Sequence, residues 1–193
     1  MTDRRAAEIM YPNQGGDWKI ELRQQPIAHR GHAFLALVHK GQIVRELHGF
    51  GHSRYTGRQE TLAYDGAHLK GTESPPDTLG DTKSIGVVKA GSQAEIGKIW
   101  AKGAAAASAI TEGNFDYKAH DPSYELGTDG GQIQNSNSVA YTVAKAMGLA
   151  ADADRLLQEQ NESRRFSGWN RDLLDPKYKR YVAPPVFPVQ DAP

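Results

Sequence analysis

The chain has 193 residues, of which 38% are hydrophobic and 24% charged, as expected for one ordinary soluble domain. Its 23 basic and 23 acidic residues give a formal net charge of zero, which removes the usual electrostatic argument for nucleic acid as a partner. No run of about 18 apolar residues predicts a membrane span, and the first ten residues lack the apolar core of a signal peptide. We therefore expect a cytoplasmic protein, or one exported without a classical signal peptide. The chain has no cysteine, which excludes disulfides, thiolate metal ligands and a cysteine nucleophile.

Hydrophobic patterns near the amino terminus indicate strands. After a lead-in of residues 1–16, one segment alternates around Trp18, Ile20 and Leu22, and the next is almost continuously apolar, which is typical of a strand buried on both faces. A short turn at 39–42 precedes a third segment. These patterns predict a three-stranded antiparallel meander with strands at 17–27, 31–38 and 43–50. Glycines, prolines and scattered polar residues predict a long irregular connection over 51–81, followed by a short strand at 83–89.

Helices are indicated in the second half of the chain. Ser92 and Glu95 fit a capping box that opens an amphipathic helix, and Gly113 ends it. A central helix is predicted over 139–147, with Gly148 at the position where a left-handed residue often follows a helix. A third helix is expected at 151–160 and a proline-rich tail at 183–193. The prediction is a single α+β domain over 17–182, with an antiparallel sheet packed against helices.

Four small polar residues precede the central helix. Asn and Ser are preferred there because their side-chain oxygens accept hydrogen bonds from backbone N–H groups that have no helical partner. The same helix end carries a partial positive charge that favours a developing oxyanion. A simple cap is therefore one interpretation, and a nucleophilic hydroxyl with oxyanion donors around it is the other. The four residues are Asn135, Ser136, Asn137 and Ser138.

A histidine at the start of the buried strand could act as the base for a nucleophilic hydroxyl. Burial disfavours the charged form of His32 and leaves a neutral imidazole able to accept a proton. Acyl transfer by a hydroxyl needs such a base, a group that orients the base, and oxyanion donors. Glu46 or His48 on the returning strand could orient His32, depending on side-chain parity. Ser136 is the expected nucleophile, with Ser138 as a second candidate if the helix starts later.

The hairpin also resembles a known architecture. A strand beginning His-Ala-Phe-Leu-Ala-Leu-Val, a glycine turn and a returning strand ending Glu46-Leu47-His48-Gly49-Phe50-Gly51 are similar to the opening hairpin of circularly permuted papain-like proteins. In those families the histidine comes first, and the nucleophile follows at the start of a helix, in an Asn-Cys-x-His-Phe or Asn-Cys-x-x-Phe pattern. Residues 135–139 resemble that pattern, with Ser136 at the nucleophile position. The segment is also similar to the Asn-Ser-Asn-Ser-Phe segment of bacterial proteins that carry a Gly-Trp further on, as residues 168–169 do here.

The resemblance extends to desumoylating-isopeptidase-like proteins, lecithin:retinol-acyltransferase-like proteins and permuted NlpC-type amidases. It implies a hydrolase or acyltransferase that acts on an amide or ester of a peptide, cell-wall peptide or lipid, in the manner of a bacterial toxin-like effector. Ser136 would be the nucleophile and His32 the base, and backbone donors, with Asn135 or Asn137, would hold the oxyanion. No cofactor is expected.

The chain departs from the family pattern because a serine hydroxyl, unlike a thiol, needs a general base. Three interpretations stay open: a serine version of the papain-like site, a catalytically inactive domain that binds a protein partner, and an engineered replacement of cysteine. A metal site is disfavoured because the histidines have no metalloprotease spacing and no accompanying carboxylate set. The histidines considered are His29, His32, His48 and His52.

Overall fold

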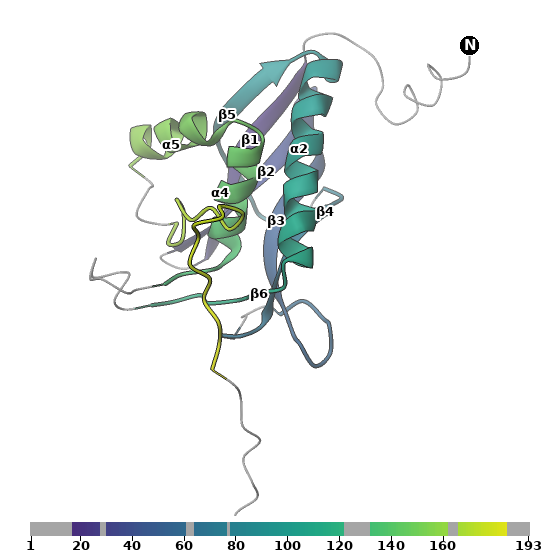
Figure 1. The fold of residues 1–193 in the computed structure, drawn as a ribbon. Coiled ribbons are helices and arrows are strands. Elements are labelled where there is room, and N and C mark those ends of the chain that lie inside the picture. The colour runs from purple at the N-terminus through teal and green to yellow at the C-terminus, as the bar shows by residue number, and fades with distance from the viewer. Residues whose placement is uncertain are drawn as a thin grey trace, which may run out of the picture.

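The computed structural model describes residues 17–27, 30–60, 64–76, 78–121, 132–161 and 166–184. The expected lead-in of residues 1–16 and most of the expected proline-rich tail lie outside these residues. Within them the chain forms an α+β structure in which one antiparallel sheet packs against helices (Figure 1). That is the fold class that the hydrophobic patterns predict.

The sheet has six strands in the order β5-β1-β2-β3-β4-β6, and all neighbours are antiparallel. The first three strands pair consecutively, so the predicted meander is confirmed. Each of them begins and ends within two residues of the prediction. The bounds are β1 Trp18–Ile27, β2 Arg30–His39, β3 Gln42–His52, β4 His68–Ser74, β5 Lys83–Gly91 and β6 Phe115–Asp116.

Strand β4 corrects the expectation of an irregular connection over 51–81. Its sequence, His-Leu-Lys-Gly-Thr-Glu-Ser, has one large apolar residue and no alternation, so it carries no local strand signal. Pairing with β3 forms the strand, in a register that runs from Glu46–Ser74 to His52–His68. Backbone hydrogen bonds to a distant partner thus decide the conformation of this segment.

Three helices belong to the described chain: α2 Gln93–Glu112, α4 Ser136–Ala146 and α5 Ala150–Glu159. Helix α2 begins as predicted, because the Ser92 side chain accepts from the backbone N–H of Glu95. Helix α4 begins three residues earlier than expected, and its N-cap is Asn135. Gly148 adopts a φ of 77°, the left-handed conformation that its position predicts. No helix among the described residues is both long and apolar enough to cross a membrane.

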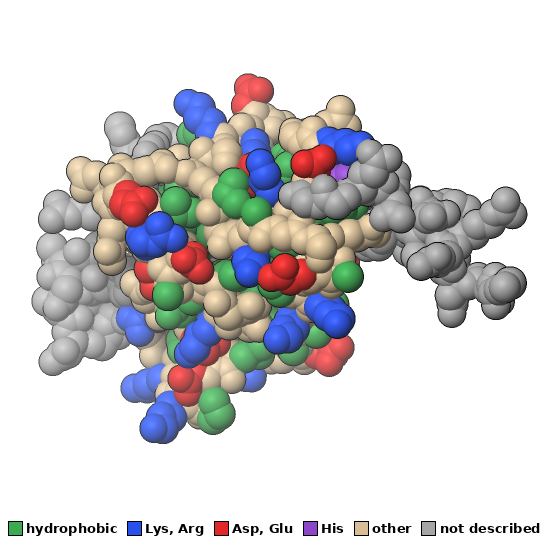
Figure 2. All heavy atoms as spheres, turned by 90° about the horizontal axis from the view of Figure 1, so that it is seen from above, with side chains coloured by type: hydrophobic (Ala, Val, Ile, Leu, Met, Phe, Trp, Pro, Cys, Tyr) green, Lys and Arg blue, Asp and Glu red, His purple; other side chains and the backbone are tan. Residues whose placement is uncertain are grey.

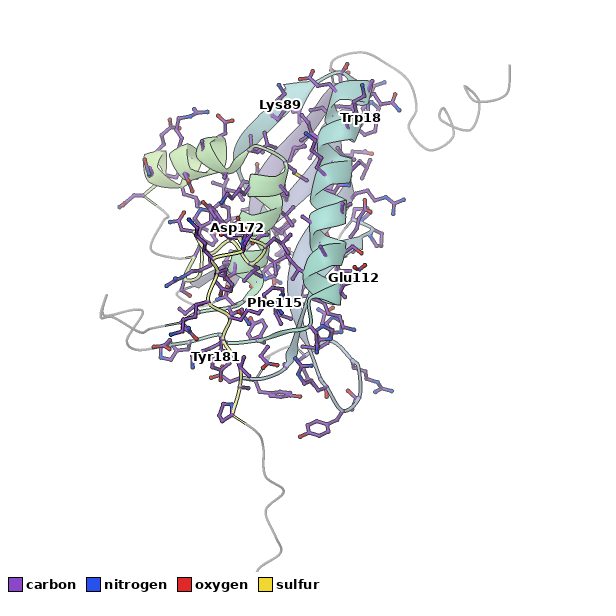
Figure 3. The ribbon with its side chains drawn as sticks, in the orientation of Figure 1. Trp18, Lys89, Glu112, Phe115, Asp172 and Tyr181 are labelled. Atoms are coloured by element: carbon purple, nitrogen blue, oxygen red, sulfur yellow. The ribbon has the colours of Figure 1, made fainter. Side chains whose placement is uncertain are left out.

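The main core lies between the sheet and the helices, with α2 and α4 side by side on one face (Figure 1). Trp18 and Phe115, both buried, mark its two ends in Figure 3. The opposite face of the sheet carries a smaller cluster, in which Phe34, Ala36 and Val38 of β2 pack with Ile43 and Leu79. Strand β2 is therefore buried on both faces, as its continuous apolar sequence predicts.

Acidic and basic side chains are interspersed on the face of the molecule drawn in Figure 2. This distribution agrees with the equal numbers of acidic and basic residues in the sequence.

Candidate active site

The first turn of α4 is held by reciprocal hydrogen bonds. The Asn135 side chain accepts from the backbone N–H groups of Asn137 (3.0 Å) and Ser138 (3.3 Å). The Ser138 hydroxyl accepts from the Asn135 N–H at 3.3 Å and donates to the carbonyl of Gly168 at 3.0 Å. Ser138 is completely buried, and the Asn135 amide donates to the carbonyl of Ser167. Capping thus accounts for Asn135 and Ser138, which are bound to the 166–170 segment and do not line the cavity described below.

Asn137 connects α4 to strand β2. Its side-chain oxygen accepts from the N–H of Ala33 at 2.8 Å, and its NH2 group donates to the carbonyls of Gly31 and Ser167, both at 3.1 Å. The pairing of β2 with β3 ends at Leu35, so the backbone of Gly31 and Ala33 has no hydrogen-bond partner on β3. The Asn137 amide takes the place of that strand. Because Gly31 and Ala33 flank His32, this side chain fixes the backbone on both sides of the histidine.

The start of α4 also lies directly on strand β3. A Cβ atom at Gly49 would stand 2.6 Å from Cβ of Val139 and 2.9 Å from Cα of Ser136. Real side chains essentially never approach this closely, so only glycine permits the contact. Gly49 thereby brings Ser136, the first residue of the helix, next to the point where β2 and β3 separate.

His32, His48 and Glu46 form a chain of buried polar groups on the sheet face away from the helices. Nε2 of His32 lies 3.2 Å from Nδ1 of His48, and Nε2 of His48 lies 3.0 Å from a carboxylate oxygen of Glu46. The same oxygen accepts from the N–H of Thr78 at 3.3 Å. The sequence left open whether Glu46 or His48 orients His32. The structure places them in series, with His48 against His32 and Glu46 behind His48.

Both histidines are neutral at physiological pH. Burial is the larger cause and the neighbouring His48 the smaller one, and together they lower the pKa of His32 from 6.5 to about 3. Burial alone lowers the pKa of His48 to about 3. When the Glu46 carboxylate accepts, His48 donates from Nε2 and its Nδ1 accepts the Nε2 proton of His32, as the hydrogen-bond chain requires. The unprotonated nitrogen of His32 is then Nδ1, which makes no hydrogen bond to the described residues.

A cavity of about 290 Å³ has both His32 and Ser136 in its wall. No direct hydrogen bond joins these two side chains, and both line the cavity. The wall further contains Tyr117, and a second cavity of about 660 Å³ adjoins the first at Gln25, which lines both. The remaining wall of the first cavity is formed by Gly49, Phe50, Gly51, Gln59, Glu60, Thr78 and Leu79.

Tyr117 is a site residue that the sequence did not reveal. Its hydroxyl lies close enough to the side chain and the backbone N–H of Ser136 for both groups to influence its pKa. Burial raises the pKa of this hydroxyl, and the neighbouring Ser136 groups oppose that rise without cancelling it, so the hydroxyl remains protonated. Nothing in the Phe-Asp-Tyr sequence around this residue distinguishes it from an ordinary core aromatic.

The expected oxyanion donors are engaged elsewhere. The amide groups of Asn135 and Asn137 bind backbone atoms, and Asn135 also occupies the N–H groups of Asn137 and Ser138. The first turn therefore leaves the N–H of Ser136 facing Tyr117. A carbonyl oxygen in the cavity would find two donors there, the Ser136 N–H and the Tyr117 hydroxyl.

Among the described residues, no group of three or more His, Asp or Glu side chains has an arrangement that could hold a metal ion. Comparisons of the chain with protein-family models, with curated proteins and with solved structures found no match.

Proposed function

We propose that this α+β protein is a serine-dependent hydrolase or acyltransferase of permuted papain-like architecture, acting on an amide or ester. The observation that carries the proposal is that Ser136 and His32 line the same cavity, with His48 and Glu46 in a hydrogen-bonded chain behind His32. A nucleophile, a base and an orienting group are the parts that acyl transfer requires. The substrate classes that the resemblance implies are a peptide, a cell-wall peptide or a lipid ester.

In the proposed reaction His32 first accepts a proton from Ser136 and then donates it to the leaving group. Nδ1 of His32 accepts the Ser136 hydroxyl proton as Oγ bonds to the substrate carbonyl carbon, and the carbonyl oxygen becomes an oxyanion that accepts from the Ser136 N–H and Tyr117. When the tetrahedral intermediate collapses, the C–N or C–O bond breaks and the leaving group takes the proton from His32. Water in a hydrolase, or an acceptor nucleophile in an acyltransferase, then attacks the acyl carbon and gives its proton to Nδ1 of His32. The C–Oγ bond breaks, and His32 returns that proton to Oγ of Ser136.

The chain Glu46–His48–His32 has the role of fixing the tautomer. A carboxylate that accepts at one end sets the direction of both imidazole hydrogen bonds, so that the lone pair of His32 is on Nδ1. His48 and Glu46 are thus positioning residues. The effector role in bacteria remains a prediction from the resemblance, and the cellular compartment remains a prediction from the composition and the first ten residues.

The test is labelling with a fluorophosphonate probe, followed by peptide mapping. The probe forms an Oγ–P bond with an activated serine and releases fluoride. We expect an adduct on Ser136 in the wild type and none in Ser136→Ala or His32→Ala. Ser108→Ala changes an exposed serine on α2 and serves as the control, with unchanged labelling. Wild-type protein that stays unlabelled over hours at millimolar probe would refute an activated serine.

A second candidate function is a catalytically inactive binding domain. It is favoured by the Ser136 hydroxyl, which lies near Tyr117 and makes no direct hydrogen bond to His32. In that case the His32 chain serves only to fill the gap between β2 and β3, and His32→Ala lowers the stability of the protein without abolishing any serine reactivity. The same labelling series therefore separates the two functions.

A further inference from the structure

The cavity that Ser136 and His32 share has an unbalanced charge. Among its described lining residues, Glu60 is the only one that is charged at neutral pH. Gln25, Gln59 and Thr78 are neutral, and so is the buried imidazole of His32. The described wall therefore carries one negative charge and no positive charge. Low-dielectric walls concentrate such a field inside a cleft, where it acts on whatever occupies the cavity.

The backbone of Glu60 is fixed. Its N–H donates to the carbonyl of Gly51 at 2.9 Å, next to a β-bridge between His52 and Gln59. The loop that leads to it closes through a hydrogen bond from the Ser53 N–H to the carbonyl of Arg58 at 2.8 Å. These contacts tie the Glu60 segment to β3, the strand that carries His48. The backbone of Glu60 therefore has a set place relative to the candidate catalytic groups.

Arg54 anchors the same loop to the rest of the protein. Its guanidinium donates to the carbonyl of Gly66 and to the side chain of Asn114, both at 2.8 Å, and to the Asp116 carboxylate at the end of β6. Tyr117 of the cavity wall directly follows Asp116. The loop with Glu60 and the segment with Tyr117 are thus held together by one side chain.

The Glu60 carboxylate differs from several other carboxylates because no described residue provides it with a cationic partner. Asp116 pairs with Arg54, Glu21 with Arg23, and Asp172 with Lys145. No ion pair of Glu60 occurs in the part of the chain that the structure describes. Glu60 is half-buried and lines the cavity, and a carboxylate with no partner among the described residues is an acceptor site for a cation that those residues do not supply.

We infer that the substrate carries a protonated amine that binds Glu60 while the scissile carbonyl lies at Ser136. This deepens the proposed function and rests on it. A sphere of 290 Å³ is about 8 Å across, the length of roughly two extended residues, so the amine lies within about two residues of the reacting carbonyl. Aminoacyl esters and peptides with a free amino terminus meet this requirement, whereas N-acylated and acidic analogues do not.

Binding is measured on Ser136→Ala protein, which has no nucleophile and cannot turn the ligand over. The ligands are L-alanyl-L-alanine amide, which is cationic, and its N-acetyl form, which is neutral. Titrations follow the ¹H–¹⁵N signals of Gly49 and Gly51 in the cavity wall. We expect a dissociation constant at least tenfold lower for the free amine, and a difference that shrinks in 0.5 M NaCl because salt screens the ion pair.

Variants assign the effect to Glu60. Adding Glu60→Gln should remove the preference for the free amine, since the amide keeps the shape and loses the charge. Adding Glu159→Gln makes the same change of net charge on α5, where Glu159 pairs with Arg155, and should leave the preference intact. Equal affinity for the two ligands, a preference that survives Glu60→Gln, or no shift with either ligand at 20 mM (roughly the weakest binding worth assigning) would overturn the inference.

The two proposals fail separately. Amine binding that depends on Glu60, together with a Ser136 that resists the fluorophosphonate probe, would leave an amine-binding domain and refute the enzyme. A labelled Ser136 without amine preference would leave the enzyme and refute the role of Glu60.

Discussion

Removing the Asn137 side chain should cost the protein more stability than removing the Ser136 hydroxyl one residue earlier. Asn137→Ala leaves the N–H of Ala33 and the carbonyl of Gly31 without partners, and both belong to buried residues. The carbonyl of Ser167 keeps its bond from Asn135. A buried polar group that loses its partner costs about 1–3 kcal/mol, so two such groups predict a loss of about 2–6 kcal/mol.

Two further variants serve as comparisons for the stability of Asn137→Ala. Asn137→Asp preserves the shape and the acceptor for Ala33, but it places a carboxylate opposite the carbonyls of Gly31 and Ser167, so we expect a loss of similar size at pH 7. Ser136→Ala removes only a hydroxyl that lies near Tyr117 and should cost less than about 1.5 kcal/mol, the upper end for one hydrogen bond.

The assay is urea unfolding at pH 7, followed by tryptophan fluorescence, with the free energy extrapolated to water. The order of stability should be wild type, then Ser136→Ala, then the two Asn137 variants. An Asn137→Ala protein within about 0.5 kcal/mol of wild type would behave like a surface substitution and would refute the bridging role of this amide.

Two predictions concern packing and pH. Gly49→Ala should lower stability by about 1–3 kcal/mol, because its Cβ overlaps Val139. Gly97→Ala, with open space around it on the exposed face of α2, should raise stability by up to about 1 kcal/mol in the same urea titrations; equal effects would contradict the packing argument. The second prediction rests on His32 and His48, whose folded pKa of about 3 lies below the unfolded value of 6.5. Only the unfolded chain takes up their protons as the pH falls below about 6.5, so each should cost about 2 kcal/mol between pH 7 and pH 5. Unfolding of wild type and of His32→Gln at both values measures this; an unchanged pH dependence in the variant would refute the buried neutral imidazole.

The fold was predictable where local pattern and tertiary environment agree. Strand β1 alternates between buried and exposed residues, and β2 is buried almost throughout. The helix after Ser92 has both a capping box and an apolar stripe, so local signals sufficed for all three elements. Strand β4 was not predictable, because its residues are polar and its conformation comes from pairing with β3. A local window contains no information about such a distant partner.

The candidate site was predictable as a set of residues, but not as a geometry. The sequence nominated His32, Glu46 and His48, because two strands joined by a short turn bring their residues together. It could not give their order, which depends on side-chain parity at a bulge between Leu37 and Val38. Tyr117 enters the site from a segment far along the chain, and no motif marks it.

The four residues at the start of α4 show how capping and chemistry divide within one motif. Asn135, Asn137 and Ser138 each have hydrogen bonds that hold the helix start, strand β2 and the 166–170 segment together. The fold alone therefore requires an Asn-x-Asn-Ser pattern, and the capping interpretation is sufficient for three positions. Ser136 is the position for which the fold demands least: its hydroxyl contacts one tyrosine and a cavity. A small substitution there should be tolerated by the fold, so a loss of function in Ser136→Ala at nearly unchanged stability would report on chemistry, whereas the same loss in Asn137→Ala would report on structure.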